Sequence, residues 1–262
     1  MTQTATMSAR NLVEDAARLR DLHIPGSPLI LANVWDPATA RIAEAAGVRA
    51  VATASAAIAP ANGYEDHGKL PPDVAFTALR RIAQAVKVPV TADLEDGYGL
   101  SAETLVQRTI DAGACGLNLE DTNHSAGTLV DADLQSERIA SIKTAARSYG
   151  FDLVVNARID VRLHGGSIAE GIRRAQKYFA AGADCVYPIF VSDISAIREF
   201  VDLGKTNILF RHGGPSLRDL ADAGVARISV GPLLFQLLSR QLQDAIASLV
   251  RLDSSALWAS EG

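Results

Sequence analysis

The stretch Val90-Thr91-Ala92-Asp93-Leu94-Glu95-Asp96-Gly97-Tyr98-Gly99 passes from apolar residues to three carboxylates and a glycine-rich turn. Its apolar start continues the run that begins at Val86, so it is typical of a buried strand. Carboxylates clustered directly after a buried strand contribute little to a core, but they are the oxygen ligands that a hard divalent cation prefers. A second acidic pair, Glu120-Asp121, follows the next apolar run in the same way. The two clusters together indicate a metal-dependent enzyme.

The alternation of apolar runs with helical segments extends along the whole chain. Strands are expected at residues 28–35, 50–55, 88–93, 115–119, 153–157, 185–190, 207–211 and 226–230. Helices are expected at residues 37–46, 72–86, 101–112, 134–149, 167–181, 193–203, 216–223 and 232–251, with an extra one at 9–22. Four of these helices end at a glycine, which accepts positive φ, and a strand follows within a few residues.

Eight strand–helix units favour a closed parallel barrel, because near-continuous apolar strands must be buried on both faces. An open doubly wound sheet would need a glycine-rich dinucleotide turn after an early strand, and the sequence has none. No linker rich in Pro, Gly or Ser interrupts the pattern. We therefore expect an α/β protein with one domain over residues 1–262, a modified (β/α)8 TIM-type barrel with an extra N-terminal helix. Its chemistry should lie at the carboxyl ends of the strands.

Charge and hydropathy restrict the partners. The net charge is −5 without blocks of like charge, which argues against nucleic acid as a partner. The sequence has no apolar run of about 18 residues, so a membrane span is not expected. We expect a small-molecule substrate and identical subunits as partners. Cys115 and Cys185 both lie in apolar runs, where free buried thiols are expected. The first ten residues lack the apolar segment of a signal peptide, so a cytoplasmic location is expected.

Several motifs together resemble the isocitrate lyase/phosphoenolpyruvate mutase superfamily. They are Asn33-Val34-Trp35-Asp36-Pro37-Ala38-Thr39-Ala40-Arg41, the acidic stretch 92–99, Leu119-Glu120-Asp121, Asn156-Ala157-Arg158 and Gly224-Val225-Ala226-Arg227-Ile228-Ser229-Val230-Gly231. Their order at successive strand ends makes the set specific, and it covers nearly the whole chain. The resemblance implies a modified (β/α)8 barrel, often a homotetramer that exchanges its terminal helix. It also implies Mg²⁺-dependent chemistry that makes or breaks C–C or C–P bonds of 2-oxo acids.

The resemblance also implies roles for individual residues. Asp93 is expected to bind Mg²⁺, or Mn²⁺, directly, and the other acids to bind it directly or through water; they are Glu95, Glu120 and Asp66. Arg158 is expected to contact the substrate and assist catalysis, although it could instead be a structural ion-pair partner. The segment Ala54-Ser55-Ala56 is expected to offer a hydroxyl and backbone N–H groups to the substrate carboxylate. His212 follows the seventh strand, where barrel ligands commonly bind, and is a further substrate-binding candidate.

One departure from the superfamily restricts the reaction. The lyase branch carries a Lys-Arg-Cys-Gly motif after the fourth strand, but this chain reads Thr122-Asn123-His124-Ser125-Ala126-Gly127-Thr128-Leu129 and has no cysteine there. Asn123 and His124 therefore become the candidate catalytic residues of a lid over residues 122–131.

Three functions remain open. The first is cleavage or decarboxylation of a small, oxaloacetate-like 2-oxo acid through a metal-bound enolate. The second is C–P chemistry, as in phosphoenolpyruvate phosphonomutase or phosphonopyruvate hydrolase, because phosphonomutases also lack the cysteine and carry an asparagine in that loop. The third is a non-catalytic relative that binds metal.

Overall fold

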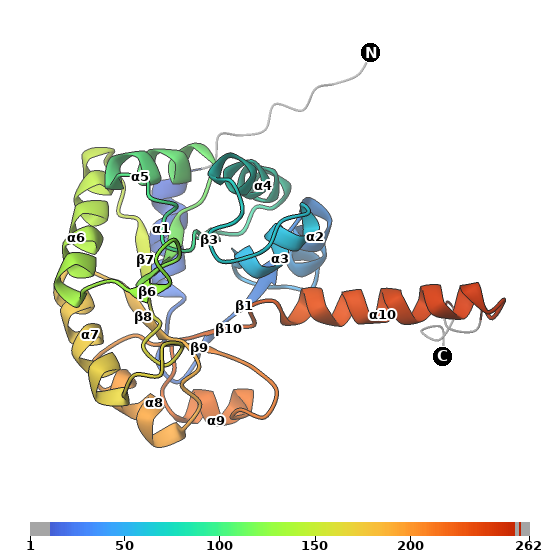
Figure 1. Ribbon diagram of the computed structural model, residues 1–262. Helices are drawn as coiled ribbons and strands as arrows, with labels where there is room; N and C mark the ends of the chain where they lie inside the picture. The colour runs from blue at the N-terminus through green and yellow to red at the C-terminus, as the bar shows by residue number, and fades with distance from the viewer. Residues whose placement is uncertain (1–10, 255–256, 258–262) are drawn as a thin grey trace, which may run out of the picture.

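A computed structural model describes residues 11–254 and residue 257, and its centre is a barrel of eight parallel strands (Figure 1). The strands are β1 (Leu29–Val34), β2 (Val51–Thr53), β3 (Val90–Asp93), β4 (Gly116–Glu120), β7 (Val154–Ile159), β8 (Cys185–Pro188), β9 (Asn207–Leu209) and β10 (Arg227–Ser229). Their order in the sheet is β8-β7-β4-β3-β2-β1-β10-β9. A parallel bridge between Val186 and Thr206 joins the two edges of this sheet, so the barrel is closed. The expected (β/α)8 TIM-type fold is confirmed.

Helices surround the barrel, and all of those expected are present with ends shifted by a few residues. They are α1 (Leu12–Asp21), α2 (Pro37–Ala45), α4 (Pro72–Ala85), α5 (Ala102–Asp111), α6 (Ala132–Ser148), α7 (Ile168–Ala180), α8 (Ile194–Val201), α9 (Leu217–Asp222) and α10 (Leu233–Val250). Residues 9 and 10 of the expected first helix lie outside the described residues. Side-chain oxygens of residues just before several helices cap the first turn, as Asp36 does by accepting from the Thr39 N–H at 2.7 Å.

Two short elements at the carboxyl ends of the strands are absent from the sequence-based predictions. Helix α3 (Ser55–Ala61) begins immediately after β2, where a loop was expected; it is rich in alanine, the strongest helix former. The expected lid over 122–131 contains a small antiparallel hairpin of β5 (Thr122–Asn123) and β6 (Thr128–Leu129). Both elements are too short for a hydrophobic period to reveal them, and both lie beside the site described below.

The amino end of the barrel is closed by α1 and by a network of charges around Asp184. One carboxylate oxygen of Asp184 accepts from Arg20 Nε at 2.7 Å. The other accepts from Lys143 Nζ and from the Val155 N–H, each at 2.9 Å. Lys143 is buried and Asp184 is nearly so. The network therefore joins α1, α6 and the strands of the barrel through one carboxylate.

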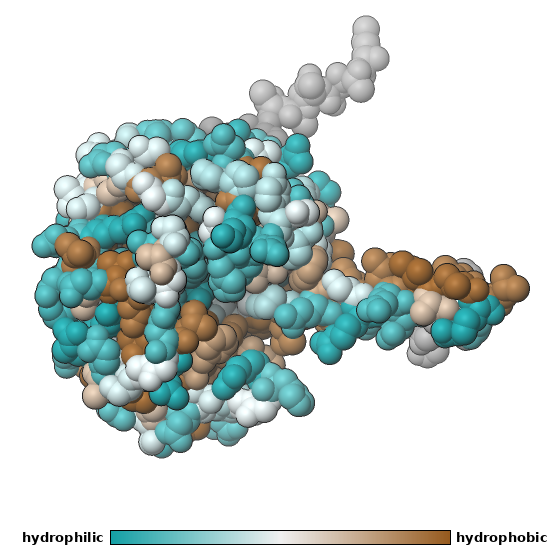
Figure 2. Space-filling view, in the orientation of Figure 1, coloured by the Kyte–Doolittle hydropathy of each residue, from teal (hydrophilic) through white to brown (hydrophobic). Residues whose placement is uncertain are grey.

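Helix α10 differs from the others because it extends away from the barrel (Figure 1). Its apolar side chains gather along one edge and its polar ones along the opposite edge (Figure 2). The apolar edge is exposed to solvent, with Leu238, Leu242 and Ile246 each about half exposed. In the part of the chain that the structure describes, no helix is both long and apolar enough to cross a bilayer.

We expect Asp184→Asn to lower the free energy of unfolding by about 3 kcal/mol, because it removes the less exposed of the two carboxylates that pair with the buried Lys143 ammonium. Urea denaturation monitored by circular dichroism measures this. Asp152→Asn is the matched control, since Asp152 pairs with the same Arg20 and Lys143 but its side chain is 54% exposed. The control should cost less than about 1 kcal/mol. Equal losses in the two variants would contradict the role given to Asp184.

Candidate active site

Four carboxylates converge at the carboxyl ends of β3 and β4. Asp93 ends β3 and Glu120 ends β4, while Glu95 lies in the turn after β3 and Asp66 in the segment between α3 and α4. Glu95 has a φ of 51°, a conformation that non-glycine residues rarely adopt and that often marks a functional site. Its carboxylate accepts a hydrogen bond from the Gly68 N–H. A Cβ at position 68 would lie 2.9 Å from the His124 Cβ, so this close approach of the two loops requires glycine.

Burial and mutual repulsion alter the acids of this cluster. Burial raises the pKa of Glu95 from its usual 4.5 to about 8, and the neighbouring charges of Asp66, Asp93 and Glu120 contribute to the rise. Burial also raises the pKa of Glu120, to about 7, although Arg158 and His124 partly oppose this. Glu95 Oε1 and Asp66 Oδ1 are buried oxygens without a hydrogen-bond partner among the described residues. The cluster therefore carries acceptors that the protein itself does not satisfy.

Asp93 is oriented by its neighbours on both sides. Its Oδ2 accepts from the Ser55 N–H at 3.0 Å and from the Ser55 hydroxyl at 3.1 Å. Its own N–H donates to the Thr53 hydroxyl at 2.7 Å. On the other side, the parallel register pairs Asp93 with Asn118, whose side-chain amide lies 3.5 Å from Asp93 Oδ1. The Ser55 hydroxyl, expected to meet the substrate, is therefore bonded to Asp93 instead.

Arg158 lies opposite Glu120 in the register of β4 and β7. One of its Nη groups donates to Glu120 Oε1, and its Nε donates to Asp160 Oδ1 at 2.6 Å. Burial alone would lower the pKa of Arg158, but these two carboxylates raise it. Arg158 thus takes part in ion pairs and also lines a cavity, so the structural and the substrate-binding interpretations apply to the same side chain.

His124 lies in the hairpin loop over the acids. Its Nε2 lies 2.9 Å from Glu120 Oε2 and 3.8 Å from Glu95 Oε2. Burial would lower the pKa of His124, but the hydrogen bond with Glu120 and the charges of Glu120 and Glu95 raise it to about 8. At neutral pH a protonated His124 therefore compensates part of the negative charge of the cluster.

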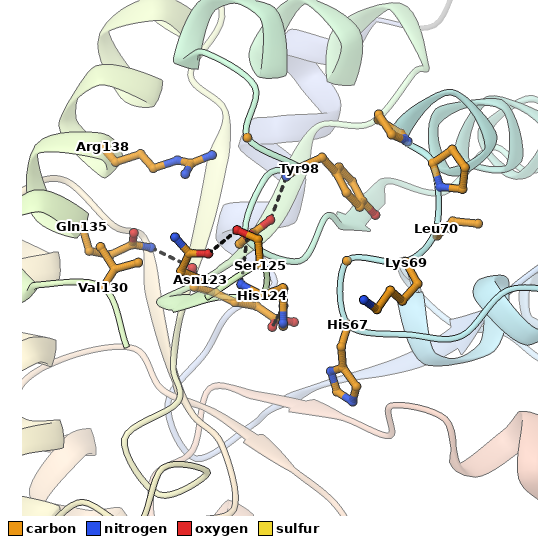
Figure 3. Close-up of a pocket in the computed structure, with 16 residues that line it drawn as sticks. His67, Lys69, Leu70, Tyr98, Asn123, His124, Ser125, Val130, Gln135 and Arg138 are labelled. Atoms are coloured by element: carbon orange, nitrogen blue, oxygen red, sulfur yellow. Dashed lines mark hydrogen bonds and ion pairs between the residues drawn. The ribbon is translucent and has the colours of Figure 1, made fainter. Parts of the chain in front are cut away.

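Two cavities meet at this cluster, and His67 lines both. A cavity of about 250 Å³ at the barrel mouth contains Asp93, Asp66 and Arg158, together with Ala54, Ser55 and Ala56. A second cavity, of about 440 Å³, lies behind the hairpin and is lined by Glu120, Asn123, His124, Lys69 and Arg138 (Figure 3). The first is small and contains Asp93 at the end of β3 together with Arg158, so we take it as the candidate active site.

Glu95, Glu120 and His124 do not line this first cavity, and neither do Asn123 and His212. Asn123 is exposed, and its side-chain oxygen accepts from the Ser125 hydroxyl at 2.8 Å and the Ala126 N–H at 3.0 Å, which is the chemistry of a turn. His212 is exposed in the loop after β9 and is not among the residues lining either cavity. Their proposed roles in the reaction stay predictions.

The oxygen atoms of the four acids are ligands of the kind that a hard divalent cation prefers. Their side chains are not arranged around one common point. Among the described residues, no group of three or more His, Cys, Asp or Glu side chains is positioned to hold an ion. Protein donors occupy several of the oxygens, including those that Glu120 presents to Arg158 and His124. The unpartnered oxygens of Glu95 and Asp66 and the raised pKa of Glu95 are nevertheless what a cation would compensate.

Two polar residues of the barrel interior, Asn118 and Arg227, are absent from the sequence-based predictions. Asn118 lines the candidate active site, and Arg227 lies entirely buried beside it. The available signal is a polar residue inside each apolar run, Asn118 within 115–119 and Arg227 within 226–230. The cysteines are both buried thiols outside any disulfide, as expected, and burial raises the pKa of Cys185 to about 12.

Known proteins that resemble this chain include mutases, lyases and hydrolases of one superfamily. Residues 19–250 match the family model described as phosphoenolpyruvate phosphomutase. A proposed phosphonomutase of Burkholderia cenocepacia is 36% identical with a TM-score of 0.86, over 91% of this chain and 99% of that one. The 2-methylisocitrate lyase of Escherichia coli is 29% identical, over 72% of this chain and 70% of its own. A phosphonopyruvate hydrolase with oxalate and Mg²⁺ shares the fold, at 22% identity and a TM-score of 0.81 over 90% of this chain and 87% of that one.

We expect the free energy of unfolding, without divalent metal, to fall as pH rises from about 4.5 to about 8. In this range an unfolded Glu95 is ionised while the folded one holds its proton, so the native state binds more protons and loses stability as pH rises. His124, with its raised pKa, adds to the fall between about 6.5 and 8. Each group that holds an extra proton in the folded state contributes at most about 1.4 kcal/mol per pH unit to this slope.

Urea midpoints measured across this pH range, with and without Mg²⁺, test this expectation. Mg²⁺ should reduce the fall, because a cation favours the ionised carboxylates. Glu95→Gln should flatten the profile, whereas Glu65→Gln, which changes an exposed acid of a neighbouring loop, should leave it unchanged. If the free energy of unfolding of the metal-free wild type rises with pH in this range, the folded state does not hold the extra protons that the raised pKa values imply.

Proposed function

Because the chain belongs to the phosphoenolpyruvate phosphomutase family, within the isocitrate lyase/phosphoenolpyruvate mutase superfamily, we propose that it is a Mg²⁺-dependent lyase of a small 2-oxo acid. The reaction we favour is C–C cleavage or decarboxylation of an oxaloacetate-like substrate through an enolate. One observation carries the proposal: Asp93 and Asp66 share a cavity with Arg158 at the carboxyl end of the barrel, with Glu95 and Glu120 close by, and Glu95 and Asp66 each have an unpartnered buried oxygen. Enzymes of barrel folds place their chemistry at this end.

The acids and the arginine would divide the work of binding. Asp93, Glu95, Glu120 and Asp66 would hold the cation, directly or through water. When bound, a divalent cation supplies a Lewis acid that favours negative charge on the keto oxygen. Arg158 would offer a planar, permanently charged fork to the substrate carboxylate. Its pairs with Glu120 and Asp160 fix the direction of that fork before substrate arrives.

The remaining residues orient groups or hold protons. Ser55 holds Asp93 Oδ2 through two hydrogen bonds, and the start of α3 forms one wall of the cavity beside it. His124 Nε2 is hydrogen-bonded to Glu120, so His124 would be a group of the lid able to hold and donate a proton. The cavity of about 250 Å³ restricts the substrate to a small acid.

C–P bond chemistry is the alternative that one observation favours. The proposed phosphonomutase from Burkholderia cenocepacia is 36% identical over nearly its whole length. The lid of this chain also lacks a cysteine, and its two cysteines are both buried. Incubation of the purified protein with oxaloacetate, 2-methylisocitrate and phosphonopyruvate, with Mg²⁺ or with EDTA, separates the possibilities. Turnover of phosphonopyruvate alone would replace our first proposal by the second.

We further propose that the protein assembles with identical copies, with a homotetramer expected, through exchange of α10. The outer face of β1 is left uncovered near the start of α10, and Ile30 there is 41% exposed. A cavity of about 460 Å³ at this place is lined mostly by apolar residues of β1 and of the α2–β2 turn. The exposed apolar edge of α10 from a second copy matches this cavity in chemistry, whereas the helix of the same chain extends away from it (Figure 1).

We expect Asp93→Ala to abolish turnover and to weaken Mg²⁺ binding at least 10-fold, because Asp93 is the proposed direct ligand. Calorimetric titration of Mg²⁺ and the substrate assay measure the two effects separately. Glu65→Ala, which removes an exposed acid near Asp66, is the control and should retain both properties. Wild-type metal affinity in Asp93→Ala would remove Asp93 from the ligand set.

We expect the paired substitution of Leu242→Asp and Ile246→Asp to reduce the assembly to smaller species, because two charges would replace the centre of the apolar edge. Size-exclusion chromatography with light scattering measures the mass. Gln243→Asp adds a charge on the same helix and should leave the assembly intact. A monomeric wild type, or an unchanged mass in the paired variant, would rule out the exchange of α10.

A further inference from the structure

Arg227 is a charged residue placed where charge is costly. It lies on β10 with 0% exposure and is among the largest fully buried side chains. Within the described residues no carboxylate lies at ion-pair distance from it, unlike Arg158 and Arg174, which both pair with acids. An arginine keeps its proton in a protein, so this side chain is a buried cation. A buried cation without a paired acid needs another source of compensation.

The contacts of Arg227 lead to the floor of the candidate active site. One Nη group donates to Asn118 Oδ1 at 3.0 Å, and Nε lies 3.4 Å from the Ser229 hydroxyl. Asn118 and Ser229 both line the cavity that holds Asp93, whereas Arg227 lies behind them. Arg227 therefore cannot touch a substrate, and any effect it has on the site must pass through these neighbours or through its charge.

The hydrogen bonds determine which way the Asn118 amide faces. Asn118 Oδ1 accepts from Arg227 and also from Asn156 Nδ2, at 2.8 Å. Because a guanidinium can only donate, the amide oxygen must face Arg227, and the NH₂ group is left to face the other way. The NH₂ group lies 3.5 Å from Asp93 Oδ1, which is a long contact. This orientation is the one compatible with a carboxylate, because the NH₂ group donates and the carboxylate accepts.

The two oxygens of Asp93 are thus held from opposite sides. Ser55 donates twice to Oδ2, and the Asn118 amide faces Oδ1. Burial lowers the pKa of Arg227, whereas Cys185, Tyr187 and Asp93 raise it, so Asp93 is the one carboxylate among the groups that favour this buried charge. Partners that orient ligating carboxylates are commonly as important for metal affinity as the carboxylates are.

We propose that Arg227 is a positioning residue of the metal site, which fixes the Asn118 amide and thereby orients Asp93 for the cation. The inference rests on the proposed function, because it assumes that Asp93 is a metal ligand. It goes beyond that function by assigning a role to a residue outside the cavity.

Calorimetric titration of Mg²⁺ into folded protein tests the proposal without any assay of activity. We expect Arg227→Met and Asn118→Ala each to raise the dissociation constant for Mg²⁺ by 10-fold or more. Arg227 is proposed to act through Asn118, so the two losses should not add. The dissociation constant of the double variant should lie within about 2-fold of that of the weaker-binding single variant. Lys143→Met is the control: it also removes a buried cation, but at the amino end of the barrel, and should leave Mg²⁺ affinity unchanged.

The outcomes separate this inference from the proposed function. If the wild type binds no Mg²⁺, the metal-dependent function and this inference are both overturned. If the wild type binds Mg²⁺ and the Arg227 or Asn118 variant binds it equally well, only the positioning role is overturned. If the losses of Mg²⁺ affinity in the two single variants multiply in the double variant, the two residues act independently, which would contradict the proposal that Arg227 acts through Asn118. Should Arg227→Met fail to fold, Asn118→Ala decides the question by the same criterion.

Discussion

The burial of carboxylates close to one another is the constraint around which the carboxyl end of this barrel is organised. Four acids from three segments converge there, and burial together with mutual repulsion raises the pKa of Glu95 to about 8. The protein compensates with His124 and Arg158, both bonded to Glu120, and with a backbone N–H from Gly68 to Glu95. Two oxygens remain without partners among the described residues. Such a cluster lowers the stability of the folded protein, and a bound cation would compensate this cost.

The barrel supplies the rigidity that this cluster needs. Parallel register sets Asp93 beside Asn118 and Glu120 beside Arg158, so each acid faces a polar partner on the neighbouring strand. The strands are short and their outer faces are covered by helices, apart from the face of β1 near α10. The polar carboxyl end of the barrel and the apolar edge of α10 therefore have different chemistry, in keeping with the two partners that we propose, a small acid and a second copy of the chain.

The fold and the acids were predictable from the sequence because both depend on local patterns. Apolar runs alternating with helical segments define the barrel, and carboxylates at the ends of two runs predict where the candidate site lies. The partners of those acids were not predictable, since they depend on register between strands. Nothing local shows that the Ser55 hydroxyl bonds to Asp93, that His124 bonds to Glu120, or that Asn118 faces Arg227. Position after a strand was likewise insufficient for His212, whose side chain is exposed.

The central claim, that the strained acids form a divalent-cation site, is tested most directly by proton release on binding. Mg²⁺ is titrated into the protein at pH 7 by calorimetry in two buffers that differ in ionisation enthalpy. A cation bound by Glu95, whose pKa is about 8, must displace its proton, so the account predicts binding with release of about one proton per ion. Binding without proton release, or no binding, would contradict it.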